Sequence, residues 1–244
     1  MKTKNKNQSF VSPEVTRQTR AMILNENSPY AFKEAYVRLR TNLMFSLSTI
    51  GDNDCKVIAV TSSNPGEGKT TTALNVAISF AMLGKKVLLI DADMRRPQLS
   101  STLKVRSDNG FSNLLGGVGE CFINRIAELG IDFITSGKVP PNPAELLASV
   151  AFEHYINKLK GDYDYIIIDT PPVNTVADAQ IVSAKIDGVV IVIRADVTKY
   201  QEFLRAEDVI SSSGGKIIGT VVNDVESKSK KYNYSEKKYY KKNV

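Results

Sequence analysis

The hydrophobic and polar positions of this chain fall into short apolar runs separated by longer stretches with helical spacing. The apolar runs are rich in Val and Ile and occupy residues 56–62, 86–93, 131–137, 163–172, 187–196 and 216–224. Continuous runs of this kind are typical of strands buried on both faces, as in a parallel sheet between helices. Helical spacing occupies residues 28–47, 71–84, 152–160, 175–185 and 199–213. The alternation predicts a single α/β domain with a doubly wound, mostly parallel sheet flanked by helices.

The two ends of the chain differ in composition from the region between them. Residues 1–27 are polar, and residues 226–244 contain seven lysines against two glutamates. Most of the formal net charge of +6 therefore lies in the last segment, and the body is close to neutral. We predict a flexible N-terminal segment at 1–27, a folded domain at 28–225 and a disordered basic tail at 226–244. The neutral body argues against a nucleic acid as partner.

Cysteine and histidine are too scarce to suggest a metal site or a disulfide framework. Cys55 and Cys121 are predicted to be buried or incidental thiols, and His154 to be an ordinary helix residue. The N-terminus lacks the apolar centre of a signal peptide, and no apolar stretch approaches the ~18–20 residues that cross a bilayer. We expect a soluble, cytoplasmic protein that another molecule must hold if it works at a membrane.

The strongest local motif is "SNPGEGKTT" at residues 63–71, which follows a predicted strand and opens a predicted helix. Backbone amides around Gly66 and Gly68 can surround a phosphate, and the helix N-terminus adds partial positive charge. Lys69 can reach the β- and γ-phosphates, and the Thr70 hydroxyl can bind Mg²⁺. Ser63 stands where such loops usually have their first glycine. We predict that ATP is bound by Pro65, Gly66, Glu67, Gly68, Lys69, Thr70 and Thr71.

Aspartates follow two further predicted strands. "LLIDADMRRP" (88–97) places Asp91 and Asp93 at one strand end, and "IIIDTPP" (166–172) places Asp169 at another. Ligands bind beyond the carboxyl ends of the strands in doubly wound folds. We predict that Thr70, Asp93 and Asp169 hold Mg²⁺, and that catalysis uses Lys69, Asp91, Asp93 and Asp169. A spare carboxylate suits a kinase, which benefits from a base facing an incoming hydroxyl.

Other residues near these motifs have less definite roles. Arg95 and Arg96 either contact phosphate or substrate or hold their loop in place. Asn223 follows the last strand and is a candidate for adenine binding.

The C-terminal stretch "YNYSEKKYY" (232–240) holds four of the ten tyrosines, set among lysines. By composition alone it is a flexible basic tail. With a kinase site upstream, we predict that Tyr232, Tyr234, Tyr239 and Tyr240 are acceptors of phosphate. Each phosphotyrosine adds about −1.5 to −2 charges, so four would reverse the charge of this segment.

Three motifs together resemble those of the bacterial protein-tyrosine kinases: "PGEGKTT", the second Walker motif "LLIDADMRRP", and "IIIDTPP". The resemblance is closer still to the cytoplasmic kinases of Gram-positive capsule and exopolysaccharide clusters. "NGFSNLLGG" (109–117), "PPNPAELL" (140–147) and the tyrosine cluster agree with this resemblance, which covers roughly residues 28–240. It implies a P-loop fold of the MinD/ParA-like class, with 28–225 as the kinase domain. Lys69 would bind the phosphates, Thr70 the Mg²⁺, and Asp91 the tyrosine proton, supported by Asp93 and Asp169. The division of roles between Asp91 and Asp93 stays open.

The same resemblance implies partners. These are a transmembrane adaptor of the polysaccharide co-polymerase type, which recruits the kinase to the inner face of the membrane, a cognate tyrosine phosphatase, and further copies of the chain. Family members often self-associate through an ExxRxxR motif in the helix before the first strand. Glu34 and Arg40 fit its outer positions, but Val37 replaces the middle arginine.

The alternatives are a MinD/ParA-like switch ATPase that acts with a membrane partner and a nucleotide-gated interaction module. The switch ATPases usually have a lysine early in the P-loop, where this chain has Asn64 followed by Pro65. That departure favours the kinase.

Overall fold

The computed structural model describes residues 22–50, 54–103, 105–118 and 123–226. Cys121 and the tyrosines of the C-terminal cluster lie outside these residues, so the predictions made for them stay predictions.

A seven-stranded sheet forms the centre of the domain, with the strand order β3-β4-β2-β5-β1-β6-β7. All neighbours are parallel except β3 and β4. The strands are β1 (Lys56–Ser62), β2 (Val87–Asp91), β3 (Asn124–Ile126), β4 (Ile131–Ile134), β5 (Tyr165–Asp169), β6 (Gly188–Arg194) and β7 (Ile217–Asn223). The predicted mostly parallel, doubly wound α/β fold is confirmed.

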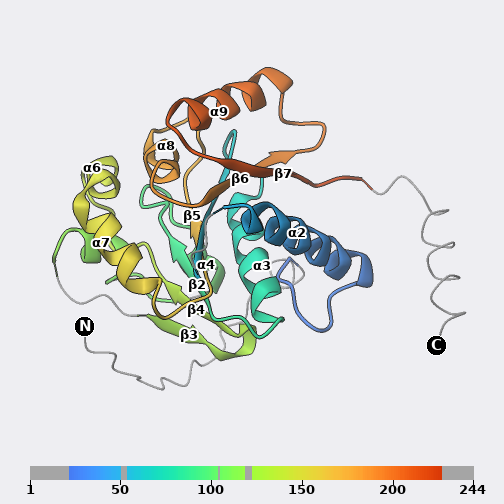
Figure 1. Ribbon diagram of the computed structural model, residues 1–244, viewed down its shortest axis with the longest axis horizontal. Coiled ribbons are helices and arrows are strands. Elements are labelled where there is room, and N and C mark those ends of the chain that lie inside the picture. The colour runs from blue at the N-terminus through green and yellow to red at the C-terminus, as the bar shows by residue number, and fades with distance from the viewer. Residues whose placement is uncertain (1–21, 51–53, 104, 119–122, 227–244) are drawn as a thin grey trace, which may run out of the picture.

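Helices cover both faces of this sheet (Figure 1). One face packs against α2 (Tyr30–Ser48), α3 (Lys69–Ala81) and α4 (Leu99–Leu103). The other packs against α5 (Phe111–Leu115), α6 (Pro143–Ala148), α7 (Val150–Leu159), α8 (Asp178–Ser183) and α9 (Tyr200–Ser212). Successive side chains of a strand point to opposite faces. In β1, Val57 and Ala59 therefore join one core and Ile58 and Val60 the other.

The sequence pattern did not indicate the short elements. β3 has three residues, NRI, and pairs antiparallel with β4 at the edge of the sheet. A strand this short has no apolar run to detect, and its residues are partly exposed. The helices α4 and α5 have five residues each, and the 3₁₀ helix Ala127–Leu129 has three. Such lengths are too short for a helical period to show.

Part of the predicted N-terminal segment is packed against the domain. Leu24 is 2% exposed and belongs to the core beneath α2 and α3. Its backbone N–H donates to Oδ1 of Asn75 on α3, and Nδ2 of Asn75 donates to the carbonyl of Met22. Residues 22–24 are thus held to α3 by one side-chain amide.

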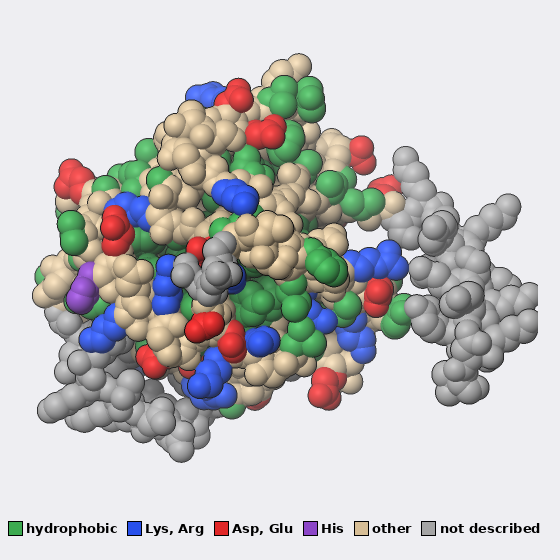
Figure 2. Space-filling model, in the orientation of Figure 1, with side chains coloured by type: hydrophobic (Ala, Val, Ile, Leu, Met, Phe, Trp, Pro, Cys, Tyr) green, Lys and Arg blue, Asp and Glu red, His purple; other side chains and the backbone are tan. Residues whose placement is uncertain are grey.

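The surface has a mixed charge. Figure 2 shows Lys and Arg side chains interspersed with Asp and Glu over one face of the domain. Cys55 is a buried free thiol. Among the residues that the structure describes, no helix combines the length and hydrophobicity needed to span a bilayer.

Candidate nucleotide-binding and catalytic site

The loop between β1 and α3 has the backbone that a phosphate-binding loop requires. Gly66 and Gly68 have φ values of +83° and +95°, in the left-handed region that favours glycine. Gly68 is also the N-cap of α3 and carries no side chain that could cap the helix. The first N–H groups of α3 are therefore open to an anion at the positive end of the helix dipole.

Three neighbouring strands bring the predicted charged residues together. Asp91 and Asp169 are register partners at the ends of β2 and β5, and Asp169 also pairs with Val60 of β1. Nζ of Lys69 lies 2.9 Å from Oδ2 of Asp93 and 3.4 Å from Oδ1 of Asp169. The Thr70 hydroxyl donates to Oδ2 of Asp169 at 2.7 Å. Motifs far apart in the sequence thus form one cluster.

Burial determines the electrostatics of this cluster. Asp91 and Asp169 are 0% exposed, and Asp93 and Lys69 only 4% and 9%. Desolvation raises the pKa of Asp91 well above its usual range, and the charge of Asp169 raises it further against the opposing effect of Lys69. Desolvation also raises the pKa of Asp169, although Lys69 and the Thr70 hydroxyl oppose it.

Lys69 responds in the opposite way. Burial disfavours its ammonium, but the charges of Asp169 and Asp93 outweigh that effect and raise its pKa above the ordinary value. The lysine therefore stays charged, as a group that binds phosphates must.

Asp91 differs from the other carboxylates in its hydrogen bonds. Its Oδ1 accepts from the backbone N–H of Asp93 at 3.2 Å. Its Oδ2 is buried without a hydrogen-bond partner among the described residues. A buried carboxylate with a free oxygen and a raised pKa is a better proton acceptor than an exposed one.

The donor set also fits Mg²⁺ held together with a nucleotide. In the described part of the chain, no three His, Cys, Asp or Glu side chains converge closely enough to hold a metal ion by themselves. Mg²⁺ in nucleotide sites is usually bound by one or two carboxylates, waters and the phosphates. The Thr70 hydroxyl, with Asp93 or Asp169, supplies a set of that kind.

Arg95 holds its loop in the structure. Its Nε and Nη2 donate to the two oxygens of Asp178 at 2.9 and 3.0 Å. Asp178 is fully buried in the first turn of α8. In the same loop, the backbone N–H of Arg96 donates to Oδ1 of Asp93 at 3.0 Å. Sequence reasoning missed Asp178, because nothing in its local sequence sets it apart from other aspartates at helix starts.

Two of the predicted nucleotide-binding residues contact other parts of the protein. Nδ2 of Asn223 donates to the backbone carbonyl of Glu67 at 3.0 Å, so this predicted adenine contact supports the P-loop here. The Glu67 side chain is 2% exposed and bonds to Thr198 and Asn64. Pro65 is exposed and Thr71 half-buried.

The helix before the first strand differs from the ExxRxxR expectation. Arg40 turns inward, where its Nη1 donates to the Ser79 carbonyl of α3 and its Nε is buried without a partner among the described residues. Glu34 pairs instead with Arg38 at 3.4 Å. The outward side of α2 exposes Tyr30, Val37, Met44 and Phe45.

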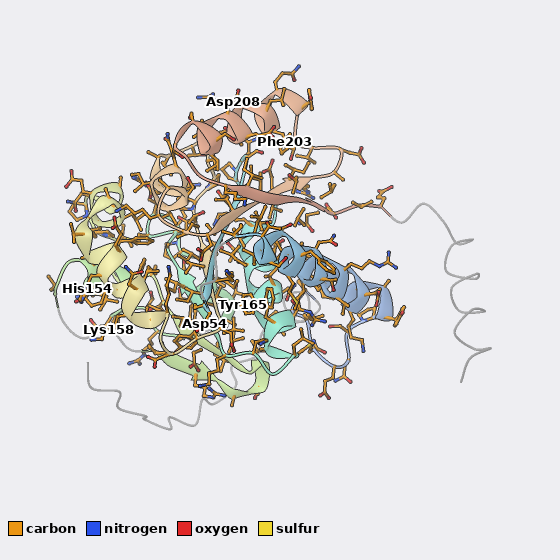
Figure 3. The ribbon with its side chains drawn as sticks, viewed as in Figure 1. Asp54, His154, Lys158, Tyr165, Phe203 and Asp208 are labelled. Atoms are coloured by element: carbon orange, nitrogen blue, oxygen red, sulfur yellow. The ribbon has the colours of Figure 1, made fainter. Side chains whose placement is uncertain are left out.

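His154 is an exposed helix residue, as predicted from the sequence. It lies with Lys158 on the exposed side of α7 (Figure 3), and its ring contacts Tyr155 edge-on. On α9, in the same view, Phe203 packs against the core, whereas Asp208 is exposed.

The site combines a glycine-rich loop between a strand and a helix with a lysine that contacts aspartates from two neighbouring parallel strands. This combination defines a P-loop nucleotide-binding protein with a second, aspartate-bearing Walker motif. MinD from Pyrococcus horikoshii shares the fold, at a TM-score of 0.60 and 23% identity over 72% of each chain.

Comparisons with known proteins identify the family within this class. The family model described as "AAA domain" matches residues 55–203. The tyrosine-protein kinase YwqD of Bacillus subtilis is 38% identical over 204 residues, which cover 82% of this chain and 85% of YwqD. The crystal structure of the chimerical protein CapA2B2 has a TM-score of 0.74 at 36% identity, covering 82% of this chain and 87% of the other. The kinase domain of Escherichia coli tyrosine kinase ETK has a TM-score of 0.76 at 31% identity, with coverage of 81% and 77%. The chain belongs to the bacterial tyrosine-protein kinases, which confirms the resemblance seen in its motifs.

Proposed function

We propose that this protein is an ATP- and Mg²⁺-dependent protein-tyrosine kinase that phosphorylates Tyr232, Tyr234, Tyr239 and Tyr240 of another copy of itself and thereby regulates capsular or exopolysaccharide synthesis and export. The observation that carries the proposal is the buried cluster of Lys69, Thr70, Asp93 and Asp169 beside Asp91, whose Oδ2 has no hydrogen-bond partner in the described part of the chain. Family membership supports tyrosine as the acceptor.

Each side chain of the cluster has a role in this proposal. The Lys69 ammonium binds the β- and γ-phosphates, and the α3 N-terminus and the P-loop amides orient them. Bound Mg²⁺ supplies positive charge against the charge that develops on the transferred phosphoryl group. Thr70, Asp93 and Asp169 would hold that ion. Asp91 accepts the proton of the tyrosine hydroxyl, because Asp93 is already paired with Lys69 and the pKa of Asp91 is raised by burial.

The proposed partners follow from the family. The chimerical protein CapA2B2 is similar to this chain over most of its length. We infer a transmembrane adaptor of the polysaccharide co-polymerase type that recruits the kinase to the inner face of the membrane, and a cognate tyrosine phosphatase that reverses the modification. Self-association would use the exposed apolar residues of α2, since Arg40 is bound to α3.

The test is phosphate transfer from γ-labelled ATP by purified protein, with and without the cytoplasmic tail of the adaptor. We expect label on tyrosine that is lost in Lys69→Ala and mostly lost when the four tail tyrosines become phenylalanine. The tail variant should still bind ATP as wild type does, which separates acceptor loss from site loss.

Other outcomes would contradict the proposal in distinct ways. Release of free phosphate without protein label would support the MinD/ParA-like switch ATPase. Nucleotide binding with neither product would support an interaction module. Undiminished label on the tail variant would place the acceptors elsewhere.

A further inference from the structure

The P-loop is bonded on one side to a segment that belongs to no recognised motif. Oε1 of Glu67 accepts a hydrogen bond from the Thr198 hydroxyl, and Oε2 accepts from the backbone N–H of Asn64 at 2.9 Å. Nδ2 of Asn64 donates to Oε2 of Glu202 at 2.9 Å. We call these four residues, Asn64, Glu67, Thr198 and Glu202, the P-loop brace. It joins the loop after β1 to the loop after β6 and to the first turn of α9.

The brace side chains have fixed hydrogen-bond roles. The Thr198 hydroxyl accepts from the backbone N–H of Arg194 at 2.8 Å, so its proton is directed to Glu67. Oε2 of Glu202 also accepts from the N–H of Lys199 at 3.2 Å, as in a capping box of α9. The backbone beyond β6 is further held by the ion pair between Arg194 and Asp224 at 2.7 Å. The P-loop is therefore bonded to a segment that is itself hydrogen-bonded to the end of β6 and to the first turn of α9.

The brace determines where a negative charge lies. Glu67 stands between the two P-loop glycines, where a carboxylate near a triphosphate would repel it. Lys69 points toward Asp93 and Asp169 on the β2 and β5 side of β1, whereas Thr198 lies on the β6 side. The contact with Thr198 thus holds the Glu67 carboxylate on the side of the loop opposite to Lys69.

We propose that Thr198 and Glu202 are positioning residues for the nucleotide: they hold Glu67 and Asn64 so that the P-loop amides and Lys69 face the phosphates. This inference rests on the proposed binding of ATP by the loop. Neither residue would contact the nucleotide. A buried carboxylate that loses one of its hydrogen-bond donors pays a desolvation penalty and reorients.

Thr198→Val and Thr198→Ser test the inference as a pair, because valine keeps the shape of threonine and serine keeps its hydroxyl. We expect Thr198→Val to weaken ATP binding, measured by titration calorimetry, about tenfold, and to raise the KM for ATP more than it lowers kcat. Thr198→Ser should bind ATP close to wild type. Thr49→Val, whose exposed hydroxyl donates to the Ser46 carbonyl of its own helix, is the matched control and should have no effect.

A double-mutant cycle with Glu67→Ala tests whether Thr198 acts through Glu67. Thr198→Val should lose most of its effect on ATP affinity in the Glu67→Ala background, since the carboxylate that it positions is gone. If Glu67→Ala does not fold, the comparison of Thr198→Val with Thr198→Ser still tests the inference. Equal ATP affinity of Thr198→Val and wild type, or equal impairment of both Thr198 variants, would overturn the inference. Failure of wild type to bind ATP would instead overturn the proposed function.

Discussion

At the scale of single residues, Gly68 is constrained both by its backbone and by its surroundings. Its φ is +95°, and a Cβ atom there would lie 2.1 Å from Nδ2 of Asn223. Gly66 has a similar φ of +83°, but a Cβ atom there would meet nothing within 4 Å. A side chain at Gly66 would therefore cause backbone strain alone, whereas one at Gly68 would cause strain and a steric clash.

We predict that Gly66→Ala lowers the free energy of unfolding by about 1–2 kcal/mol, the cost of a left-handed non-glycine residue. Gly68→Ala should lower it by about 1 kcal/mol more, because the Asn223 amide must move and loses its bond to Glu67. Urea unfolding measures both. In an Asn223→Ala background the excess for Gly68→Ala should vanish. Equal losses for the two glycine variants would refute the steric argument.

Some residues of the site could be predicted from local motifs, and others could not. Lys69, Thr70 and Asp169 were accessible from sequence, because a strand end followed by a motif determines where such side chains lie. Asp178 and Thr198 were not, since each acts on a residue distant in sequence and sits in an unremarkable local pattern. Glu67 was predicted from its place in the loop, but the direction of its side chain depends on Thr198.

At the scale of elements, α2 presents an apolar side to solvent. Tyr30, Val37 and Met44 follow one another at intervals of seven residues, and Phe45 beside them is 72% exposed. Residues seven apart lie on one side of a helix. Leu43 and Leu47, on the adjoining side of the helix, are buried against α3 and the sheet.

We predict that Met44→Ser combined with Phe45→Ser weakens self-association. Truncating apolar side chains at an interface reduces the free energy of association by about 1–3 kcal/mol. Sedimentation velocity over a range of concentrations measures the change. The free energy of unfolding of the monomer should stay within about 0.5 kcal/mol. Val150→Ser, which alters an 82% exposed valine on α7, is the control. An unchanged dissociation constant would argue against α2 as the interface.

Long elements were predictable and short ones were not, for a physical reason. β1 was located to the residue, because the six positions after Lys56 are all buried and carry apolar or small side chains. The predicted run 131–137 is longer than β4, which ends at Ile134. Thr135 and Ser136 are nevertheless fully buried, because the backbone of Gly110 to Ser112 packs directly against them. Burial without strand pairing gives the same sequence pattern as a strand.

At the scale of the whole molecule, the carboxyl end of β7 lies at the same edge of the sheet as the site. The order β2-β5-β1-β6-β7 places β7 four strands from β2, or about 19 Å at the usual strand spacing. An extended chain from Glu226 to Tyr232 spans at most about 20 Å, and one to Tyr240 about 50 Å. Chain length therefore allows phosphorylation within one subunit as well as between subunits.

Mixing two variants distinguishes transfer within one subunit from transfer between subunits. One is Lys69→Ala with its tyrosines intact and a larger tag, and the other is active but has phenylalanine at Tyr232, Tyr234, Tyr239 and Tyr240. Transfer between subunits predicts label on the tagged, inactive chain, with an initial rate that rises with the concentration of the active one. A tagged chain lacking both Lys69 and the four tyrosines is the control and should stay unlabelled. If wild type labels itself while the tagged chain does not, and both variants still associate in sedimentation, the transfer occurs within one subunit.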